Sequence, residues 1–254
     1  MLWTIKRFNP TFAHPFKVYH KGDLSAENQA RLRRVYAPFF FENVSDGDYQ
    51  SKIAHYLALE AFRETEPEQV VFIDCDILCL GDISYLDRLD HPLSLALDFD
   101  FKNPFGFNVY GPLSPLARVN TGVFALNRTY RDGATYQALH ALLKQFPDEY
   151  KKGVAWSDQG IVNQLFRWRT KFILPYYYNA RKNLFKNRKF ARGPEAALRG
   201  VRLLHFGGAY KPFLGGLKGV PPESKHHKYS QLHQVYYSYW DRMIADLQVD
   251  WKLP

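Results

Sequence analysis

The chain has 254 residues, of which 46% are hydrophobic and 17% aromatic, and this is enough for one large domain with a sizeable core. Its formal net charge is +9 at pH 7. No stretch of about eighteen uncharged apolar residues occurs, which excludes a predicted membrane-spanning helix, and Lys6 and Arg7 interrupt the apolar N-terminus, so we expect no signal peptide. Two cysteines, Cys75 and Cys79, are too few for a disulfide framework or a cysteine zinc site, and we expect both to be small buried thiols in a reducing cytoplasm.

Helices and strands alternate along the sequence. Apolar residues three or four apart predict helices, and short apolar runs rich in β-branched residues predict strands. In chain order we expect a helix over 2–8, a strand over 17–20, a helix over 26–36 capped by Ser25, an edge strand over 39–44, a helix over 51–62, a strand over 70–73, a short helix over 83–89, a strand over 93–97, a loop over 99–119, a strand over 122–127, helices over 132–146 and 158–168, a strand over 201–206 and a C-terminal amphipathic helix over 232–247. This alternation predicts an α/β fold with an open, mainly parallel sheet.

Residues 70–78 carry the most specific chemical signal. The apolar run 70–73 predicts a strand buried on both faces, as in the middle of a parallel sheet. It ends on Asp74-Cys75-Asp76, where a turn would let both carboxylates reach one point. Neighbouring carboxylates repel each other, so both stay ionised at low cost when a cation lies between them. A divalent ion holding a diphosphate fits this demand, although an isolated Asp-x-Asp more often caps a turn and is solvated.

Further polar residues are predicted at the same edge of the sheet. Asp98 follows the strand 93–97, as Asp74 follows its own strand, and in open α/β sheets ligands bind beyond the carboxyl ends of the strands. Asn120 is expected just ahead of the strand 122–127, and Asp158-Gln159 at a helix N-terminus.

The stretch 205–213 has the composition of a metal and phosphate site. An imidazole, from His205, beside two carboxylates suits manganese better than calcium. Gly207 and Gly208 let the backbone approach a phosphate closely, and Lys211 adds a point charge. Taken alone, His205 is more often a hydrogen-bonded core histidine and Lys211 a surface lysine, so the prediction depends on their combination with the acidic pair.

These four segments, in this order, resemble the family-eight retaining glycosyltransferases over about residues 17–215. In that family an Asp-x-Asp follows an apolar strand, Asn-x-Gly-Val and Asp-Gln segments come later, and His-x-x-Gly-x-x-Lys-Pro closes the catalytic domain. His205, Gly208, Lys211 and Pro212 match the last pattern position by position. The resemblance implies a GT-A fold, a Rossmann-like mixed, mainly parallel sheet flanked by helices. It implies a catalytic domain over 1–215 and a helical C-terminal extension over 216–254.

The resemblance also implies how the chain would hold metal and diphosphate. Asp74, Asp76 and His205 would bind Mn²⁺, with Mg²⁺ as the alternative, and Asp74 would also lie near the nucleotide ribose. Gly208 and Lys211 would hold the diphosphate of a UDP-sugar.

The remaining matches imply the sugar side of the site. Asp98, Asn120 and Asp158 would contact the donor sugar. Gln159, assigned a catalytic role together with Asp158, would face the anomeric carbon opposite the leaving group. Lys52 would stand on the phosphate side, although an apparent insertion over 63–68 makes its placement less direct.

The activity implied is a metal-dependent transfer of a hexose from a UDP-sugar to a hydroxyl of a glycan or glycolipid, in polysaccharide or lipopolysaccharide biosynthesis. Negative charge develops on the leaving diphosphate, where a metal and Lys211 would stabilise it. The sugar becomes oxocarbenium-like, so nearby carboxylates help. Gln159 is a poor nucleophile, which favours same-face attack by the acceptor over a covalent intermediate. We expect a cytoplasmic protein with peripheral contact to an anionic inner membrane face, and no nucleic acid partner.

Two features depart from the family pattern. Nothing before Lys17 supplies the usual first strand and base-gripping turn, so we expect the first nucleotide-binding strand to be missing from this sequence. Gly160 replaces the acid that often follows Asp-Gln, which would alter the sugar preference.

Two other classes of function stay open on the sequence. A phosphoryl-transfer or nuclease-like enzyme could use Asp74 and Asp76 for metals and would tolerate the loss of His205. A non-enzymatic protein could bind nucleic acid or acidic glycan through the basic region 167–202, with an affinity that falls steeply with salt. This region contains Arg167, Arg169, Lys171, Arg181, Lys182, Lys186, Arg188, Lys189 and Arg192.

Overall fold

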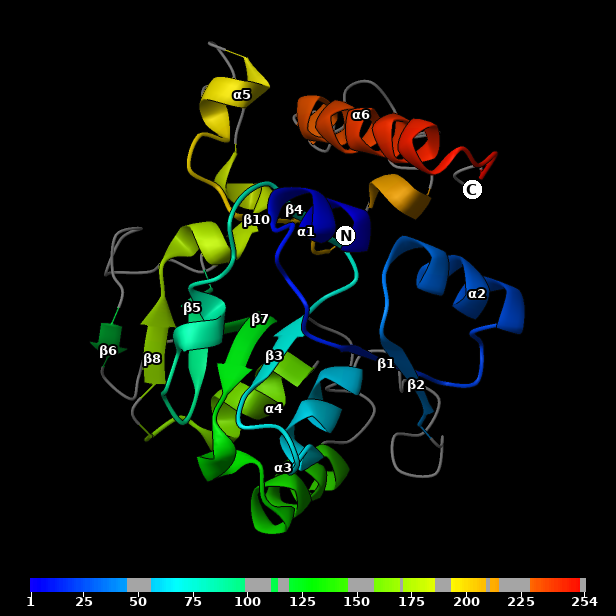
Figure 1. The fold of residues 1–254 in the computed structure, drawn as a ribbon. Coiled ribbons are helices and arrows are strands. Elements are labelled where there is room, and N and C mark those ends of the chain that lie inside the picture. Colours follow the sequence, from blue (N-terminus) through cyan, green and yellow to red (C-terminus); the bar gives the residue numbers. More distant parts are fainter. Residues whose placement is uncertain are drawn as a thin grey trace.

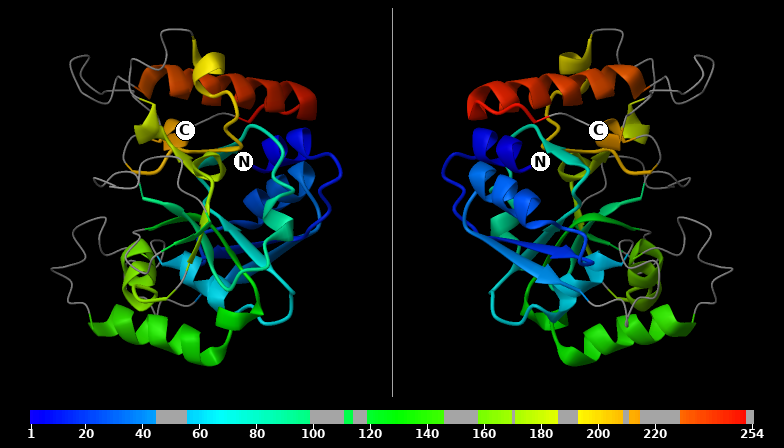
Figure 2. Two further views of the ribbon diagram at one scale, coloured as in Figure 1. Left: turned by 90° about the vertical axis from the view of Figure 1, so that its left-hand side faces the viewer. Right: turned by 90° about the vertical axis from the view of Figure 1, so that its right-hand side faces the viewer.

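The computed structural model describes residues 1–44, 56–98, 111–113, 119–145, 158–169, 171–185, 193–208, 211–214 and 229–251. Within them, a five-stranded sheet and two smaller sheets are flanked by helices (Figure 1). The helices α3 (Gly133–Gln145) and α6 (Ser230–Leu247) lie at opposite ends of the molecule, with the strands between them (Figure 2). The predicted α/β class is confirmed.

The large sheet is mixed. Its order is β3 (Val70–Ile73), β7 (Val119–Leu126), β5 (Ser94–Leu97), β8 (Lys171–Leu174) and β6 (Gly111–Leu113). β5 and β8 are parallel, whereas β7 is antiparallel to both β3 and β5, and β6 is antiparallel to β8. β3, β5 and β8 therefore run in one direction, as expected of a mainly parallel sheet, but β7 inserts between two of them and makes most neighbouring pairs antiparallel.

β3 does not lie in the middle of the sheet, as its sequence predicted. It is the first strand in the order, and among the described residues it pairs with β7 alone. Its four residues are all only partly buried. The alternation of its side chains is still that of a strand with two apolar faces, because Val70 and Phe72 pack in one core cluster and Val71 and Ile73 in another.

Two smaller sheets complete the strands. β1 (Phe16–His20) pairs in parallel with β2 (Phe39–Asn43). β10 (Leu203–His205) lies between β4 (Ile77–Cys79), to which it is antiparallel, and β9 (Ala180–Arg181), to which it is parallel. Four strands were not predicted from the sequence, because they have two to four residues each and are too short for a periodic pattern: β4, β6, β8 and β9.

Most predicted helices are present. α1 (Leu2–Phe8), α2 (Ala26–Val35), α3, α4 (Asp158–Leu165) and α6 agree with the expected segments, and α5 (Pro194–Ala197) was not predicted. The Ser25 hydroxyl accepts a hydrogen bond from the Asn28 amide, so the predicted N-cap of α2 is confirmed. The expected helix 51–62 is a 3-10 helix over its described part, Leu57–Arg63, and the expected helix 83–89 shortens to a 3-10 turn, Leu86–Arg88.

Core packing ties the C-terminal helix to the rest of the fold. Leu232 and Tyr236 of α6 pack with Leu204 and Phe206 of the β10 segment. Farther along α6, the Tyr239 ring lies 6.5 Å from the Trp3 ring of α1, centroid to centroid. The described part of the expected extension therefore packs on segments from the first 215 residues.

Candidate active site

The strand ends bring the Asp-x-Asp segment next to His205. The Asp74 amide donates to the carbonyl of Gly122 in β7 at 2.8 Å. The Phe206 amide donates to the carbonyl of Asp76 at 3.0 Å, directly beyond the β4–β10 pairing that ends at His205. Asp74 and Asp76 are thus fixed by their backbones to two different sheets, and His205 lies where those sheets meet.

Asp74, Asp76 and His205 form a group that could hold a metal ion. One ligand atom from each lies within 4.8 Å of the others. The Nε2 atom of His205 is 3.2 Å from Asp76 Oδ1 and 3.6 Å from Asp74 Oδ2. Two carboxylate oxygens and an imidazole nitrogen are a donor set that suits a divalent transition metal. The residues predicted from the sequence as metal ligands are therefore together in the structure.

Charge at this cluster is balanced by Lys211. Its Nζ atom lies 2.8 Å from Asp76 Oδ2, and the Asp76 side chain is only 3% exposed. Burial opposes ionisation of Asp76, but the contacts with His205 and Lys211 outweigh it and hold the pKa of this carboxyl well below its usual range. Partial burial beside the carboxylates of Asp76 and Asp158 raises the pKa of Asp74 well above its usual range, even though 39% of its side chain stays exposed.

Two glycines leave room for the His205 ring. A Cβ at Gly122 would lie 2.3 Å from His205 Cε1, and a Cβ at Gly207 would lie 2.8 Å from His205 Nε2. Real contacts are never this short, so any side chain at either position would displace the imidazole. Gly208, the next residue, has a φ of +84°, a conformation that favours glycine. Gly122 and Gly207 therefore set the position of His205, and Gly208 sets the path of the chain toward Lys211.

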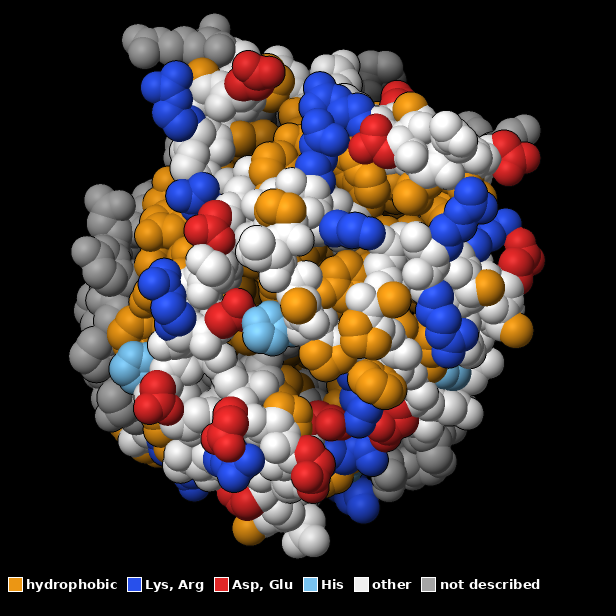
Figure 3. All heavy atoms as spheres, viewed as in Figure 1, with side chains coloured by type: hydrophobic (Ala, Val, Ile, Leu, Met, Phe, Trp, Pro, Cys, Tyr) orange, Lys and Arg blue, Asp and Glu red, His pale blue; other side chains and the backbone are white. Residues whose placement is uncertain are grey.

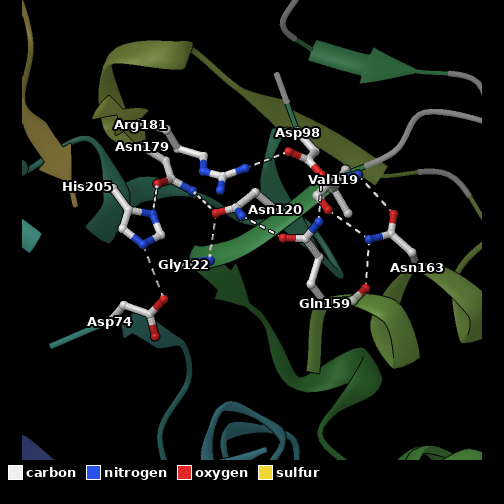
Figure 4. A network of polar contacts seen from close by, with 10 residues as sticks. All are labelled: Asp74, Asp98, Val119, Asn120, Gly122, Gln159, Asn163, Asn179, Arg181 and His205. Atoms are coloured by element: carbon white, nitrogen blue, oxygen red, sulfur yellow. Dashed lines mark hydrogen bonds and ion pairs between the residues drawn. The ribbon is translucent and has the colours of Figure 1, made fainter. Parts of the chain in front are cut away.

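A buried network of amide side chains adjoins the cluster (Figure 4). Gln159, at the first turn of α4, donates through Nε2 to Asp98 Oδ2 at 2.6 Å and accepts through Oε1 from Asn120 Nδ2 at 2.6 Å. Arg181 Nη1 donates to Asp98 Oδ1 at 2.7 Å. Asn179 then links Asn120 to His205. The network runs from the acidic end of β5 to the metal cluster.

The predicted site residues can now be placed. Asp74, Asp76, His205 and Lys211 lie together, and Asp98, Asn120 and Gln159 share one hydrogen-bonded network. Asp158 is the first residue of α4 and is near enough to raise the pKa of Asp74. Gly208 is exposed beside the cluster, and Lys52 lies outside the described residues.

Two sequence predictions are corrected at this site. Asn120 lies inside β7 and not ahead of it, because the strand begins at Val119. Cys79 is buried as expected, but Cys75 is exposed, because it occupies the turn between the two aspartates.

The basic region 167–202 is not one surface patch. Lys171 is 1% exposed and donates to the carbonyls of Phe166 and Arg169, and burial lowers its pKa to about 8. Arg181 and Lys182 are also buried. On the face shown in Figure 3, basic and acidic side chains are interspersed. Residues 186–192 lie outside the described residues, so Lys186, Arg188, Lys189 and Arg192 are not placed.

Two functional candidates, Asn179 and Arg181, were not predicted as such from the sequence. Arg181 was counted among the basic residues of a surface, and Asn179 was not singled out. Both lie at β9, a strand of two residues that gives no periodic signal. Asp98, the partner of Arg181, is 83 positions away in the sequence.

Comparisons with known proteins identify the family and the fold of this chain. The sequence model of glycosyl transferase family 8 matches residues 25–215. A crystal structure of the galactosyltransferase LgtC in complex with donor and acceptor sugar analogs has a TM-score of 0.64 and 18% identity, covering 91% of this chain and 88% of that chain. The glycosyltransferase GlyE of Streptococcus pneumoniae has a TM-score of 0.62 and 18% identity, covering 96% of this chain and 58% of that chain. These structures support the GT-A fold.

No match was found among the curated proteins. Within the described residues, no helix combines the length and the apolar composition that crossing a membrane requires.

Proposed function

The chain belongs to glycosyl transferase family 8, and we propose that it moves a hexose from a UDP-sugar to a hydroxyl of a glycan or glycolipid with retention at the anomeric carbon. The observation that carries this proposal is the group of Asp74, Asp76 and His205 beside the buried network that contains Gln159. A divalent ion held by this group would neutralise a leaving diphosphate, and the network would offer polar groups to a sugar.

The proposed metal is Mn²⁺, with Mg²⁺ as the alternative. The donor set of Asp74, Asp76 and His205 fits it, because an imidazole nitrogen beside two carboxylates favours a borderline ion over calcium. Bound there, a divalent ion would supply positive charge to the diphosphate as the sugar leaves. Asp76 would hold that ion as a carboxylate, since its contacts with His205 and Lys211 keep it ionised.

Lys211 and the two glycines form the proposed diphosphate side. The Lys211 ammonium, 30% exposed, can turn from Asp76 toward a phosphate oxygen without leaving the cluster. Gly208 has a φ of +84°, which favours glycine, and because glycine has no side chain its backbone would be open to an approaching phosphate. Stabilisation by Lys211 would be strongest when negative charge develops on the leaving group.

Asp98, Asn120, Asp158 and Gln159 form the proposed sugar side. Both carboxylate oxygens of Asp98 already accept hydrogen bonds, from Arg181 and Gln159, so Asp98 is a poor candidate for a covalent nucleophile. An amide such as that of Gln159 is a weak nucleophile as well. These contacts support same-face attack by the acceptor hydroxyl, with Gln159 orienting the sugar.

We further propose that residues 1–215 form the catalytic domain and 216–254 a helical extension that packs on it. The acceptor would be an anionic glycan or a glycolipid at the inner face of a membrane. In this proposal the basic region 167–202 would face the acceptor. Its contribution is smaller than its composition indicates, because Lys171, Arg181 and Lys182 are buried. The same burial weakens the alternative of a nucleic acid binder.

Release of UDP from a panel of UDP-sugars, with Mn²⁺ and with a chelator, tests the proposal. Turnover by one donor that stops on chelation is expected, and Asp76→Asn should lose it. Asp90→Asn, which removes an exposed aspartate bonded to Asn127, is the matched control and should stay active.

His205→Ala separates this function from phosphoryl transfer by the acidic pair alone. The variant should lose sugar transfer together with metal binding. Absence of turnover with every UDP-sugar in the presence of Mn²⁺, in a protein that binds Mn²⁺, would refute the proposed function.

A further inference from the structure

The amide network is a directed chain of donors and acceptors. It runs from His205 Nδ1 to Asn179 Oδ1 at 2.8 Å, from Asn179 Nδ2 to Asn120 Oδ1 at 2.7 Å, and from Asn120 Nδ2 to Gln159 Oε1 at 2.6 Å. It ends at Asp98, where Gln159 Nε2 donates at 2.6 Å. All five residues are at least 95% buried, so water does not compete for these bonds.

Asp98 fixes the direction in which the hydrogen bonds of this network run. A carboxylate paired with a guanidinium only accepts hydrogen bonds, so Gln159 has to turn its NH₂ group toward Asp98. The Gln159 carbonyl then faces Asn120, which has to donate. The carbonyl of Asn120 is left to face the other way, toward Asn179.

A backbone group independently fixes the same direction for these hydrogen bonds. The amide N–H of Gly122 donates to Asn120 Oδ1 at 3.0 Å, and a backbone N–H has no other role. The carbonyl of Asn120 therefore accepts from both Gly122 and Asn179. Since the NH₂ group of Asn179 is used there, its carbonyl oxygen faces His205, and only a protonated Nδ1 satisfies that contact.

We propose that Asn179 is a positioning residue for His205: it holds the proton on Nδ1 and points Nε2 at Asp74 and Asp76. The orientation of Asn179 is in turn set by Asn120, whose amide belongs to the sugar side of the site. This inference rests on the proposed function, because it treats His205 as a metal ligand. It joins the metal side and the sugar side through side chains alone.

Metal affinity without any donor tests the inference first. The probe is Mn²⁺ alone, titrated into the full chain and followed by the electron paramagnetic resonance signal of the free ion. Asn179→Leu should weaken binding by about 10- to 100-fold, the usual cost of losing a partner that orients a ligating histidine. Asn179→Asp keeps an acceptor for Nδ1–H, although it loses the donor to Asn120 Oδ1, and should therefore lose less of the affinity than Asn179→Leu.

The matched control is Asn183→Leu, four positions along the same segment. Asn183 accepts from the Tyr229 hydroxyl at 2.6 Å and is outside the hydrogen bonds that run from Asp98 to His205. It should leave the metal affinity unchanged. Equal loss in Asn183→Leu and Asn179→Leu would overturn the inference, because it would mean that any amide in this segment matters equally.

The tautomer of His205 gives a readout that a merely structural role would not move. In protein labelled with ¹⁵N-histidine, assigned with His205→Gln and saturated with diamagnetic Mg²⁺, the His205 ring should carry its proton on Nδ1. Asn179→Asp should preserve this signature, and Asn179→Leu should shift it toward the Nε2–H form. Asn120→Leu, which removes the acceptor of the Asn179 NH₂ group, should also weaken the Nδ1–H signature.

These outcomes stand apart from those that judge the proposed function. Parent affinity and an unchanged tautomer in a folded Asn179→Leu protein would overturn the inference whatever the activity. Loss of metal binding and of the Nδ1–H signature would support it even if no UDP-sugar were turned over, a result that would refute the function alone.

Discussion

Lys211 should have opposite effects on the affinity for the metal ion and on the affinity for the nucleotide. Its ammonium lies 2.8 Å from Asp76 Oδ2 and partly neutralises the carboxylate that a cation would need. A charge-assisted hydrogen bond contributes about 1.5–3 kcal/mol net, and we take the lower end because Lys211 is 30% exposed. Removing it with Lys211→Met should therefore strengthen the binding of a divalent ion alone by about tenfold, at about 1.4 kcal/mol per tenfold change.

The same change should weaken the binding of UDP. When the ion is saturating, the variant lacks the ammonium that would move to the diphosphate. Loss of a charged contact of this kind should lower the affinity for UDP about tenfold or more. The assay is a pair of calorimetric titrations, Mn²⁺ into free protein and UDP into protein saturated with Mn²⁺.

Lys17→Met is the matched control. Lys17 is also paired with carboxylates, 2.9 Å from Glu42 and 2.6 Å from Glu64, but it lies on β1 and not at the cluster. It should change neither affinity. If Lys211→Met weakened the binding of the ion alone, Lys211 would be supporting the metal site and not competing for it, and the reasoning from the Asp76 contact would be refuted.

Two further substitutions test the walls of the site. Gly122→Ala places a Cβ 2.3 Å from His205 Cε1 and should lower the Mn²⁺ affinity of a folded protein at least about tenfold. Gly133→Ala, where a Cβ meets nothing within 4 Å, should leave the affinity unchanged. Equal affinities in the two variants would contradict the steric argument. Arg181→Met leaves the Asp98 carboxylate buried without its guanidinium and should lower the free energy of unfolding, measured in urea, by about 3–5 kcal/mol. Adding Asp98→Asn should recover most of this loss. A loss below about 1 kcal/mol would show that the pair is solvated.

The metal cluster could be predicted because its residues carry strong local signals. An apolar run that ends on Asp74-Cys75-Asp76 predicts a strand and a turn, and the Gly-Gly pair after His205 predicts close backbone approach. The sequence also predicted that Asp98 and Gln159 would belong to the site. What it could not give was the order of the strands, because β7 inserts between β3 and β5 through contacts far apart in the chain.

Burial of polar side chains was the harder part to predict. Lys171, Arg181 and Lys182 look like solvated residues of a basic segment, since a lysine or arginine is buried only when it has partners. Those partners are backbone carbonyls near Lys171 and the distant Asp98 for Arg181, and no local pattern announces either. Asn179 was missed for the same reason, because its importance depends on where β9 places it and not on its neighbours in sequence.

His233, on α6, should make the stability of the protein depend on pH in the mildly acidic range. Its side chain is 3% exposed, and neither ring nitrogen has a hydrogen-bond partner among the residues that the structure describes. The ring lies 6.1 Å from that of Phe206, centroid to centroid. Burial, helped by the charge of Lys182, lowers the pKa of His233 from 6.5 to about 4. The unfolded chain therefore takes up a proton below about pH 6.5 that the folded chain refuses until about pH 4.

Stability should accordingly be complete above about pH 6.5 and fall as the pH drops toward about 4, by up to about 1.4 kcal/mol per pH unit from this group. His233→Leu keeps an apolar side chain of similar size and removes the proton, so the variant should lose less stability than the parent over this range. Urea unfolding of both proteins at several pH values measures the difference. His14→Leu, which changes a histidine whose side chain is 61% exposed, should keep the steeper slope of the parent. Parallel slopes in the parent and in His233→Leu would mean that His233 is protonated in the folded protein, and the unpaired ring nitrogens would then need another explanation.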